Sequence, residues 1–239
     1  MRPGTATVSR AIAMGAVVVA ATVPLSGCVS TVSGTAVRGP DLGQFDVPPL
    51  DETKLNDVLL SIGELNGIMG STTMRVTSEL DEMTDHSDDV SDRDCLGTVY
   101  GAEEPVYDGS GWTHVRDEVA REPGDDNAHW VEQTAVLYPS PRNAQRFFDD
   151  SRRAWQNCAG TPVAIFSDDE AYFWDLDDVL TEDALITQMT TQDDADGWAC
   201  QHALAVASNL TVETWACGYT IIDEAETIAR EMLANAARR

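Results

Sequence analysis

Four cysteines in the second half of the chain have the number and spacing to form disulfide bonds, namely Cys95, Cys158, Cys200 and Cys217. A metal site would instead need these thiolates clustered with imidazoles. The four histidines show no such ligand spacing and lie at His86, His114, His129 and His202. The sequence therefore predicts two structural disulfides, no metal and no cofactor.

The pairing of these cysteines follows from a predicted hairpin. Strands at 199–207 and 210–217 flank Ser208-Asn209, and a two-residue loop places Cys200 directly opposite Cys217. Counted outward from the loop, that position is a non-hydrogen-bonded pair, whose short Cα separation suits a disulfide. Cys95 is then left to pair with Cys158.

Catalytic chemistry finds little support. Gly109-Ser110-Gly111 lacks the G-x-S-x-G spacing of a nucleophile elbow and is typical of a turn. Aspartates cluster at 175–178 and 193–196, but a chain with 41 acidic residues produces such clusters by chance, and a solvated face explains them. An EF-hand starting at Asp193 would put Leu204 where the loop needs glutamate, which leaves only weak surface calcium binding open. We expect no catalytic residue.

The tryptophans are the better candidates for a binding site. Trp155 and Trp174 have apolar neighbours and are predicted to lie in the core. The other four are expected at strand ends or in the hairpin, where aromatic residues often line clefts; they are Trp112, Trp130, Trp198 and Trp215. Trp215 would face His202 across the hairpin, for which ordinary cross-strand packing is the simpler explanation.

Polar residues within predicted strands complete the candidate site. Gln133 lies in an apolar alternation and must find hydrogen-bond partners if it is buried. Arg116 and Gln201 are comparable polar positions in strands. The residues predicted to bind a ligand are Arg116, Gln133, Gln201, Trp112 and Trp215.

The N-terminal segment has the layout of an export signal. Arg2 and Arg10 precede an apolar run of 15 residues at 11–25, which is shorter than the roughly 20 residues that a spanning helix needs. The following Leu25-Ser26-Gly27-Cys28 resembles the lipobox of bacterial lipoproteins. The resemblance implies that Cys28 is lipidated, becomes the first residue of the mature chain and anchors it to the outer face of the cell membrane, because two or more acyl chains hold a protein there stably.

Charge excludes one class of partner. Without residues 1–27, which hold two arginines and no acid, 13 basic and 41 acidic residues remain, a net charge of −28. Such a field repels phosphate backbones, so we expect no nucleic acid partner. We expect a signal peptide at 1–27, a flexible Ser/Thr/Gly/Pro tether at 28–50 and one domain at 51–239.

Hydrophobic periodicity predicts an α+β domain. Apolar residues recur at helical spacing over 55–69 before Gly70, and an acidic mobile loop is expected at 81–94. Ser140 and Pro141 begin a helix whose buried face ends at Cys158, and a last helix starts near Ile221 with Ile222 turned inward. Strands are predicted at 73–79, 112–119, 130–138, 163–166, 172–176 and 185–191, besides the hairpin. Short connections favour an antiparallel sheet flanked by helices.

Several segments of this domain resemble one known family. They are Cys95-Leu-Gly, Val106-Tyr-Asp-Gly-Ser-Gly-Trp112, Val131-Glu-Gln-Thr-Ala-Val-Leu-Tyr-Pro139, Trp155-Gln-Asn-Cys158, Gly197-Trp-Ala-Cys-Gln201 and Ala216-Cys217. Together they resemble the PknH-like extracellular sensor domain of actinobacterial Ser/Thr kinases and its stand-alone lipoprotein relatives. The resemblance covers about residues 52–237. It implies an antiparallel domain with a deep, ligand-sized cleft and the same two disulfides.

These observations predict a non-enzymatic cell-surface lipoprotein that binds a small molecule, lipid or cell-envelope component. The chain contains no kinase Gly-rich loop, His-Arg-Asp loop or Asp-Phe-Gly, so phosphorylation is not carried over from the resemblance. The alternatives are an envelope protein–protein interaction or structural module and, less favoured, a hydrolase. A hydrolase would require a serine or cysteine beside one of the histidines.

Overall fold

The computed structural model describes residues 46–124, 127–167 and 170–238, and within these ranges one antiparallel sheet of nine strands organises the domain. The strand order is β1-β2-β3-β9-β8-β7-β5-β4, and β6 pairs with β7. The strands are β1 (Arg75–Leu80), β2 (His114–Arg121), β3 (His129–Leu137), β4 (Val163–Ser167), β5 (Glu170–Leu176), β6 (Leu180–Glu182), β7 (Leu185–Gln192), β8 (Ala199–Ala207) and β9 (Leu210–Gly218). The α+β antiparallel fold predicted from the sequence is confirmed.

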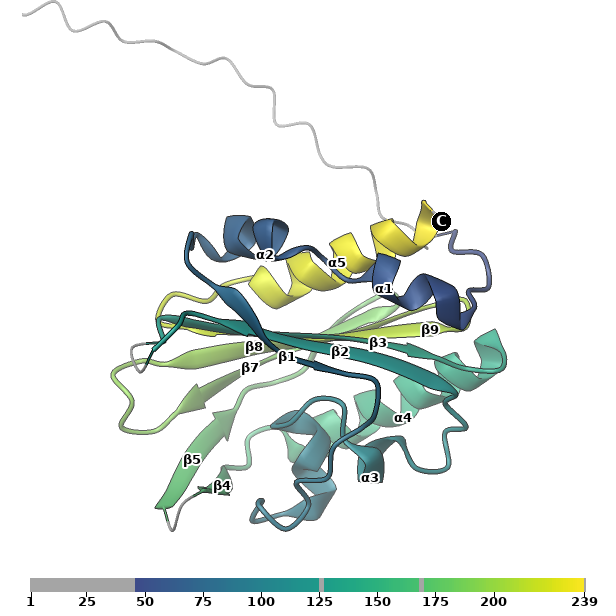
Figure 1. The fold of residues 1–239 in the computed structure, drawn as a ribbon. Coiled ribbons are helices and arrows are strands. Elements are labelled where there is room, and N and C mark those ends of the chain that lie inside the picture. Colours follow the sequence, from purple (N-terminus) through teal and green to yellow (C-terminus); the bar gives the residue numbers. More distant parts are fainter. Residues whose placement is uncertain (1–45, 125–126, 168–169, 239) are drawn as a thin grey trace, which may run out of the picture. The chain divides into compact units, whose positions relative to one another are not determined.

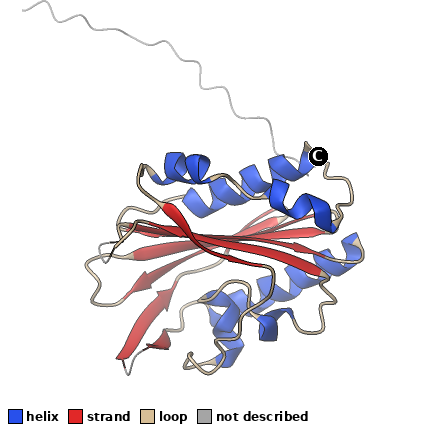
Figure 2. Ribbon diagram, viewed as in Figure 1, coloured by secondary structure: helices blue, strands red, loops and turns tan. Residues whose placement is uncertain are grey.

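Helices cover both faces of this sheet (Figures 1 and 2). An upper layer, above the sheet in Figure 1, holds η1 (Glu52–Lys54), α1 (Leu55–Val58), α2 (Ile62–Met69) and α5 (Glu224–Ala237). A lower layer holds η2 (Arg93–Thr98), α3 (Glu104–Tyr107) and α4 (Pro141–Cys158). Because side chains alternate along a strand, each central strand contributes to two separate cores.

The upper core is apolar and rich in small side chains. Ala135, Ala203 and Ala216 are fully buried sheet residues, and they meet Ile228 and Met232 of α5. Their small volume lets the helix approach the sheet closely, as close packing in protein interiors requires.

The first residues of the described chain are fixed to the hairpin turn. Asn209, in the turn between β8 and β9, accepts a hydrogen bond from the Leu50 N–H and donates one to the Leu50 carbonyl oxygen, at 2.8 and 2.9 Å. Val47 and Leu50 are buried in the upper core, although the sequence analysis placed them in the tether. The packed domain therefore extends to Val47. The predicted signal peptide, Cys28 and the tether up to residue 45 lie outside the described residues.

The helix predicted over 55–69 is interrupted, which corrects the sequence analysis. Ser61 caps α2 by accepting from the Glu64 N–H, and the Glu64 carboxylate accepts from the Ser61 N–H. This capping box starts a new helix at Ile62. The Leu60 N–H and carbonyl both bond to the Gln133 side chain, so the break costs no unpaired backbone group. Gly70 ends α2 in a left-handed conformation, as expected.

The structure differs from the sequence-based prediction in two further places, the start of α5 and the presence of β6. α5 begins at Glu224 rather than near Ile221, and Ile222, predicted to face inward, is 76% exposed. β6 was not predicted, because three exposed residues carry no period-two signal. By contrast, the buried face predicted for α4 is confirmed from Ala144 to Cys158.

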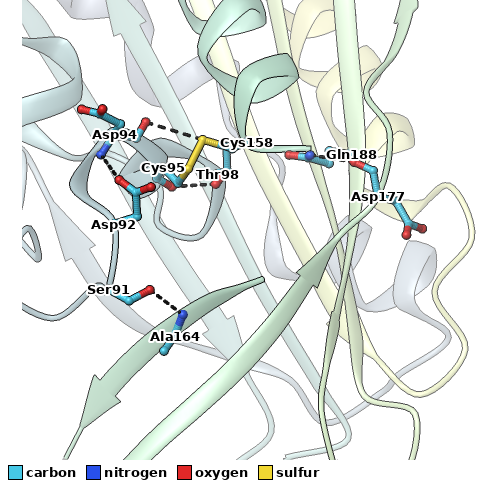
Figure 3. The surroundings of a disulfide bond; sticks show 9 residues. All are labelled: Ser91, Asp92, Asp94, Cys95, Thr98, Cys158, Ala164, Asp177 and Gln188. Carbon is cyan, nitrogen blue, oxygen red and sulfur yellow. Dashed lines mark hydrogen bonds between the residues drawn. A yellow bond between two sulfur atoms is a disulfide. The ribbon is translucent and has the colours of Figure 1, made fainter. Parts of the chain in front are cut away.

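Both predicted disulfides are present. Cys200 and Cys217 face each other across β8 and β9 with a Cα separation of 4.0 Å, in the predicted hairpin register. Cys95 of η2 bonds to Cys158 at the end of α4, with Cα atoms 5.7 Å apart (Figure 3). The Thr98 hydroxyl donates to the Cys95 carbonyl oxygen beside this second bond. The lower layer is thus covalently closed between η2 and α4.

Candidate functional site

A cavity of about 490 Å³ lies under the lower face of the sheet. Strands β1, β2, β3, β5, β7, β8 and β9 contribute to its walls, together with the segment Thr84–Glu103. Cavities of this size hold a small organic ligand. Its lining comprises Ser78, Leu80, Thr84, His86, Val99, Tyr100, Gly101, Glu103, Asp117, Val119, Asn127, Trp130, Glu132, Trp174, Thr190, Trp198, Cys200, Trp215 and Cys217.

Tryptophans form one wall of this cavity. Trp130, Trp198 and Trp215 reach it from the ends of the central strands, and the Cys200–Cys217 disulfide lies among them. Trp174, predicted as a core residue, also lines the cavity and is only partly buried. Trp174 is therefore less buried than predicted, because β5 lies toward one edge of the sheet, and it packs against the cluster of Cys200, Trp215 and Cys217.

Carboxyl groups form the neighbouring part of the lining, since Glu132 pairs with Trp215 across β3 and β9. Asp117 and Glu132 lie on neighbouring strands and are 4% and 8% exposed. Their carboxyl groups hydrogen-bond to each other, which requires a proton on one of them. The Thr134 hydroxyl also donates to Asp117, at 2.6 Å. Burial raises the pKa of Glu132 well above its ordinary value, and the nearby Asp117 and Glu213 carboxylates raise it further.

A third carboxyl group in the lining, that of Glu103, comes from the segment Thr84–Glu103. Glu103 is 1% exposed and bonds to the Nδ1 of His86, to the His86 N–H and to the Thr84 hydroxyl. The His86 ring stacks on Tyr100 with centroids 4.5 Å apart. Burial raises the pKa of the Tyr100 hydroxyl to about 12. The hydroxyl of Tyr100 is therefore neutral at physiological pH.

Behind this lining, a buried network connects the sheet to α3 and α4. The Glu213 carboxylate accepts from the Tyr107 hydroxyl at 2.7 Å and lies 2.9 Å from the His202 Nε2. The His202 ring lies between Trp155 and Trp215, with centroids 3.9 and 3.8 Å away. Burial lowers the pKa of His202 and favours the neutral ring, although Glu213 opposes this shift. The predicted pairing of His202 with Trp215 is confirmed.

Several buried polar atoms near the cavity have no hydrogen-bond partner among the described residues. They include the indole nitrogen of Trp215 and the side-chain oxygen of Asn127, both from residues that line the cavity. Buried polar atoms are nearly always satisfied in folded proteins. One such donor and one such acceptor thus belong to residues that line the same cavity.

The five predicted ligand residues do not come together. Trp215 lines the cavity, whereas Trp112 packs against the core beside α4. Gln133 faces the upper layer, where it bonds to Leu60 and Glu118. Gln201 also faces upward and accepts from the Glu226 N–H at the start of α5. Arg116 bonds to Asn56 of α1. The side chains of Gln133 and Gln201 thus connect layers of the fold and lie away from the cavity.

Sequence reasoning missed the buried carboxyl groups Asp117, Glu132 and Glu213. A signal was present in β9, where Glu213 is the one charged residue in a strand that is buried along its whole length. An acid in such a strand must face other polar groups. Its partners, His202 of β8 and Tyr107 of α3, could not be recognised because they come from two other elements of the fold.

The described residues hold no group of three or more metal-ligating side chains, and none of their helices is long and apolar enough to cross a membrane. Each histidine pairs with a glutamate: His86 with Glu103, His114 with Glu52, His129 with Glu122 and His202 with Glu213.

Comparison with known proteins gives consistent matches. Residues 50–235 match the family described as the PknH-like extracellular domain. The Ser/Thr protein kinases PknH of Mycobacterium bovis and Mycobacterium tuberculosis are 37% identical over 185 residues, or 77% of this chain. The chain spans only 31% and 30% of their respective lengths. The crystal structure of the extracellular domain of PknH from M. tuberculosis superposes on this chain with a TM-score of 0.77 and 35% sequence identity. The superposed region covers 81% of this chain and 100% of the PknH domain.

Proposed function

The chain belongs to the family of PknH-like extracellular domains, and we propose from this that it is a cell-surface lipoprotein whose domain binds a small molecule, lipid or cell-envelope component without converting it. One observation carries the proposal. The cavity combines a tryptophan wall with buried carboxyl groups and two unpaired polar atoms, which is the composition of a ligand site.

A binding role without catalysis is favoured by the same geometry. The matched part of the PknH kinases is their extracellular domain, and each of the four histidine rings lies within ion-pair distance of a glutamate. A hydrolase would need a serine or cysteine in that place.

Thermal unfolding tests ligand binding directly. We expect cell-envelope extract to raise the melting temperature of the purified chain, because a ligand present at 100 times its Kd adds about 2.7 kcal/mol. Trp198→Ala should abolish the rise, since Trp198 lines the cavity. Trp112→Ala is the matched control, because Trp112 is also partly buried but packs elsewhere. An equal loss in both variants, or no rise with the intact chain, would count against the proposal.

Membrane anchoring is tested separately. The Leu25-Ser26-Gly27-Cys28 sequence supports lipidation at Cys28. Cys28→Ala should move the protein from the membrane fraction to the soluble fraction, while the unmodified protein, which keeps Cys28, should stay in the membrane fraction. Continued membrane association of the variant would refute the lipid anchor.

A protein–protein interaction role is the second candidate, and one surface favours it. Phe166 and Phe173 are 45% and 51% exposed, and the β4–β5 register places them on the same side of the hairpin. Exposed aromatic groups side by side often mark an interface. Replacing both by serine should leave ligand-induced stabilisation unchanged and remove a partner, if this surface holds one.

A further inference from the structure

We propose that the cavity takes a small organic cation, with an ammonium group at the Asp117–Glu132 pair and an apolar body against the tryptophan wall. The inference rests on the proposed function, because it assigns a ligand class to the same cavity. It starts from the side chains that line the cavity.

The charged side chains that line the cavity are mostly acidic. Within the part of the chain that the structure describes, three carboxyl side chains and one histidine line the cavity, and no lysine or arginine does. Glu103 has His86 as its partner. Among the described residues, Asp117 and Glu132 form no ion pair with a basic side chain and hydrogen-bond to each other instead. Buried carboxylates are normally paired with a cation, so this pair lacks its usual counterpart.

The backbone permits a close approach at this point. A Cβ atom on Gly101 would lie 2.9 Å from the Glu132 Oε1 and 3.0 Å from its Oε2. Glycine at position 101 therefore leaves the Glu132 carboxyl group the room that it occupies beside the cavity. No larger residue fits there without moving that group.

The tryptophan wall suits the same class of ligand. Indole faces attract cations by their quadrupole and bury apolar groups, and the attraction grows when water is excluded. Trp215, which is 4% exposed, supplies a second and independent sign of a missing ligand, since its buried indole N–H has no acceptor among the described residues. The Asn127 oxygen lacks a donor in the same way. An ammonium N–H and a neighbouring hydroxyl or carbonyl oxygen on one small molecule would satisfy both.

A matched series of probes tests the charge preference. The probes are phenylalaninol, its diol analogue with hydroxyl in place of ammonium, and phenyllactate, so that one apolar ring carries a cationic, a neutral or an anionic head. Binding to the intact chain is followed by titration calorimetry and by the NMR signals of the tryptophan indole N–H groups. We expect phenylalaninol to bind at least tenfold more tightly than the other two probes and to shift the Trp215 signal.

The carboxyl pair is then tested by substitution. Asp117→Asn combined with Glu132→Gln removes the charge at nearly constant shape and should reduce phenylalaninol affinity about tenfold without changing the affinity for the diol. Glu118→Gln is the matched control, because Glu118 lies on the same strand but faces the upper layer and bonds to Gln133. Melting curves confirm that each variant is folded, and the probe series on the intact chain gives its result even if the double variant does not fold.

The outcomes separate the two proposals. Equal affinity for cation and diol, or preference for phenyllactate, would overturn the cation assignment while leaving a ligand-binding cavity. Absence of binding by all probes also overturns it. Stabilisation by envelope extract that depends on Trp198 would still support the proposed function in that case.

Discussion

The two faces of the central sheet contrast sharply, although they are made by the same strands. On β3, Val131, Gln133 and Ala135 face the upper layer, while Trp130 and Glu132 face the cavity. Above, even the polar Gln133 has its amide fully used in bonds to the backbone and to Glu118. Below, Asp117 and Glu132 lie beside each other without a basic partner, and the Trp215 indole nitrogen and the Asn127 side-chain oxygen have no partner among the described residues.

The contrast teaches where stability and binding are located. The upper face meets the ordinary requirements of a stable core, with apolar contacts and satisfied polar groups. The lower face keeps groups that raise the free energy of the folded state, as binding sites commonly do. Substitutions above should therefore change stability alone, and substitutions below should change binding more than stability.

The largest expected effect tests the upper face. Ile228→Ala in α5 should lower the free energy of unfolding by about 2–5 kcal/mol, because a fully buried side chain leaves a cavity. Urea denaturation measures the loss, and probe affinity should stay unchanged at temperatures where the variant is folded. Reduced probe affinity in the folded variant would contradict the assignment of stability to the upper face and binding to the lower face.

Removal of the Cys95–Cys158 disulfide should come next. Cys95→Ala with Cys158→Ala should cost about 2–4 kcal/mol, because the bond closes a loop with a sequence separation of 63 residues. The lower layer should open before the upper one, which amide hydrogen exchange can follow separately in α4 and α5. Equal exchange rates in both helices would show that the two layers unfold together.

Gln133→Leu should have an intermediate effect. The Leu60 N–H and carbonyl would lose their partner and the free energy of unfolding should fall by about 1–3 kcal/mol. Because Gln133 faces away from the cavity, titration calorimetry should find unchanged probe binding. A clear loss of affinity would restore Gln133 as a ligand residue, as the sequence analysis predicted.

The smallest effect should be a gain in stability. Burial raises the pKa of Glu132 above its ordinary value of 4.5, so the folded state holds a proton that the unfolded chain releases as pH rises. Folding at pH 7 must take up this proton, and Glu132→Gln removes that cost while keeping a donor to Asp117. The melting temperature should rise at pH 7, by about 2–4 °C for each kcal/mol gained, and the gain should vanish below pH 4. A gain that is independent of pH would contradict a protonated Glu132.

The sequence predicted the fold well where turn or capping residues coincide with a clear hydrophobic pattern. The Ser208-Asn209 turn set the hairpin register, and this register placed Cys200 opposite Cys217 and His202 opposite Trp215. Ser140 and Pro141 similarly marked the start of α4. The break before α2 had a local signal that was overlooked, the capping box of Ser61 and Glu64. The side chain that satisfies the Leu60 backbone was not predictable, because Gln133 lies 73 residues further along the chain.

The site was only partly predictable for the same reason. Trp130, Trp198 and Trp215 were expected at a cleft, and they do line the cavity. Asp117 and Glu132 meet through the β2–β3 register, which pairs residues that a local pattern cannot align. Trp174 reaches the cavity because β5 pairs with β7 at the far side of the hairpin. Long-range pairing decided which polar residues share one environment.

The two hydrogen bonds between Leu50 and Asn209 fix how far the N-terminal end of the domain lies from the cavity. Asn209 lies at one end of the β8–β9 hairpin, and the cavity residues Cys200 and Cys217 lie at the other. Cys217 lies eight positions beyond Asn209, which is roughly 26 Å of extended strand. The hairpin is held between β3 and β7 in the middle of the sheet, so the cavity residues Cys200 and Cys217 stay a fixed distance from the residues that hold Leu50.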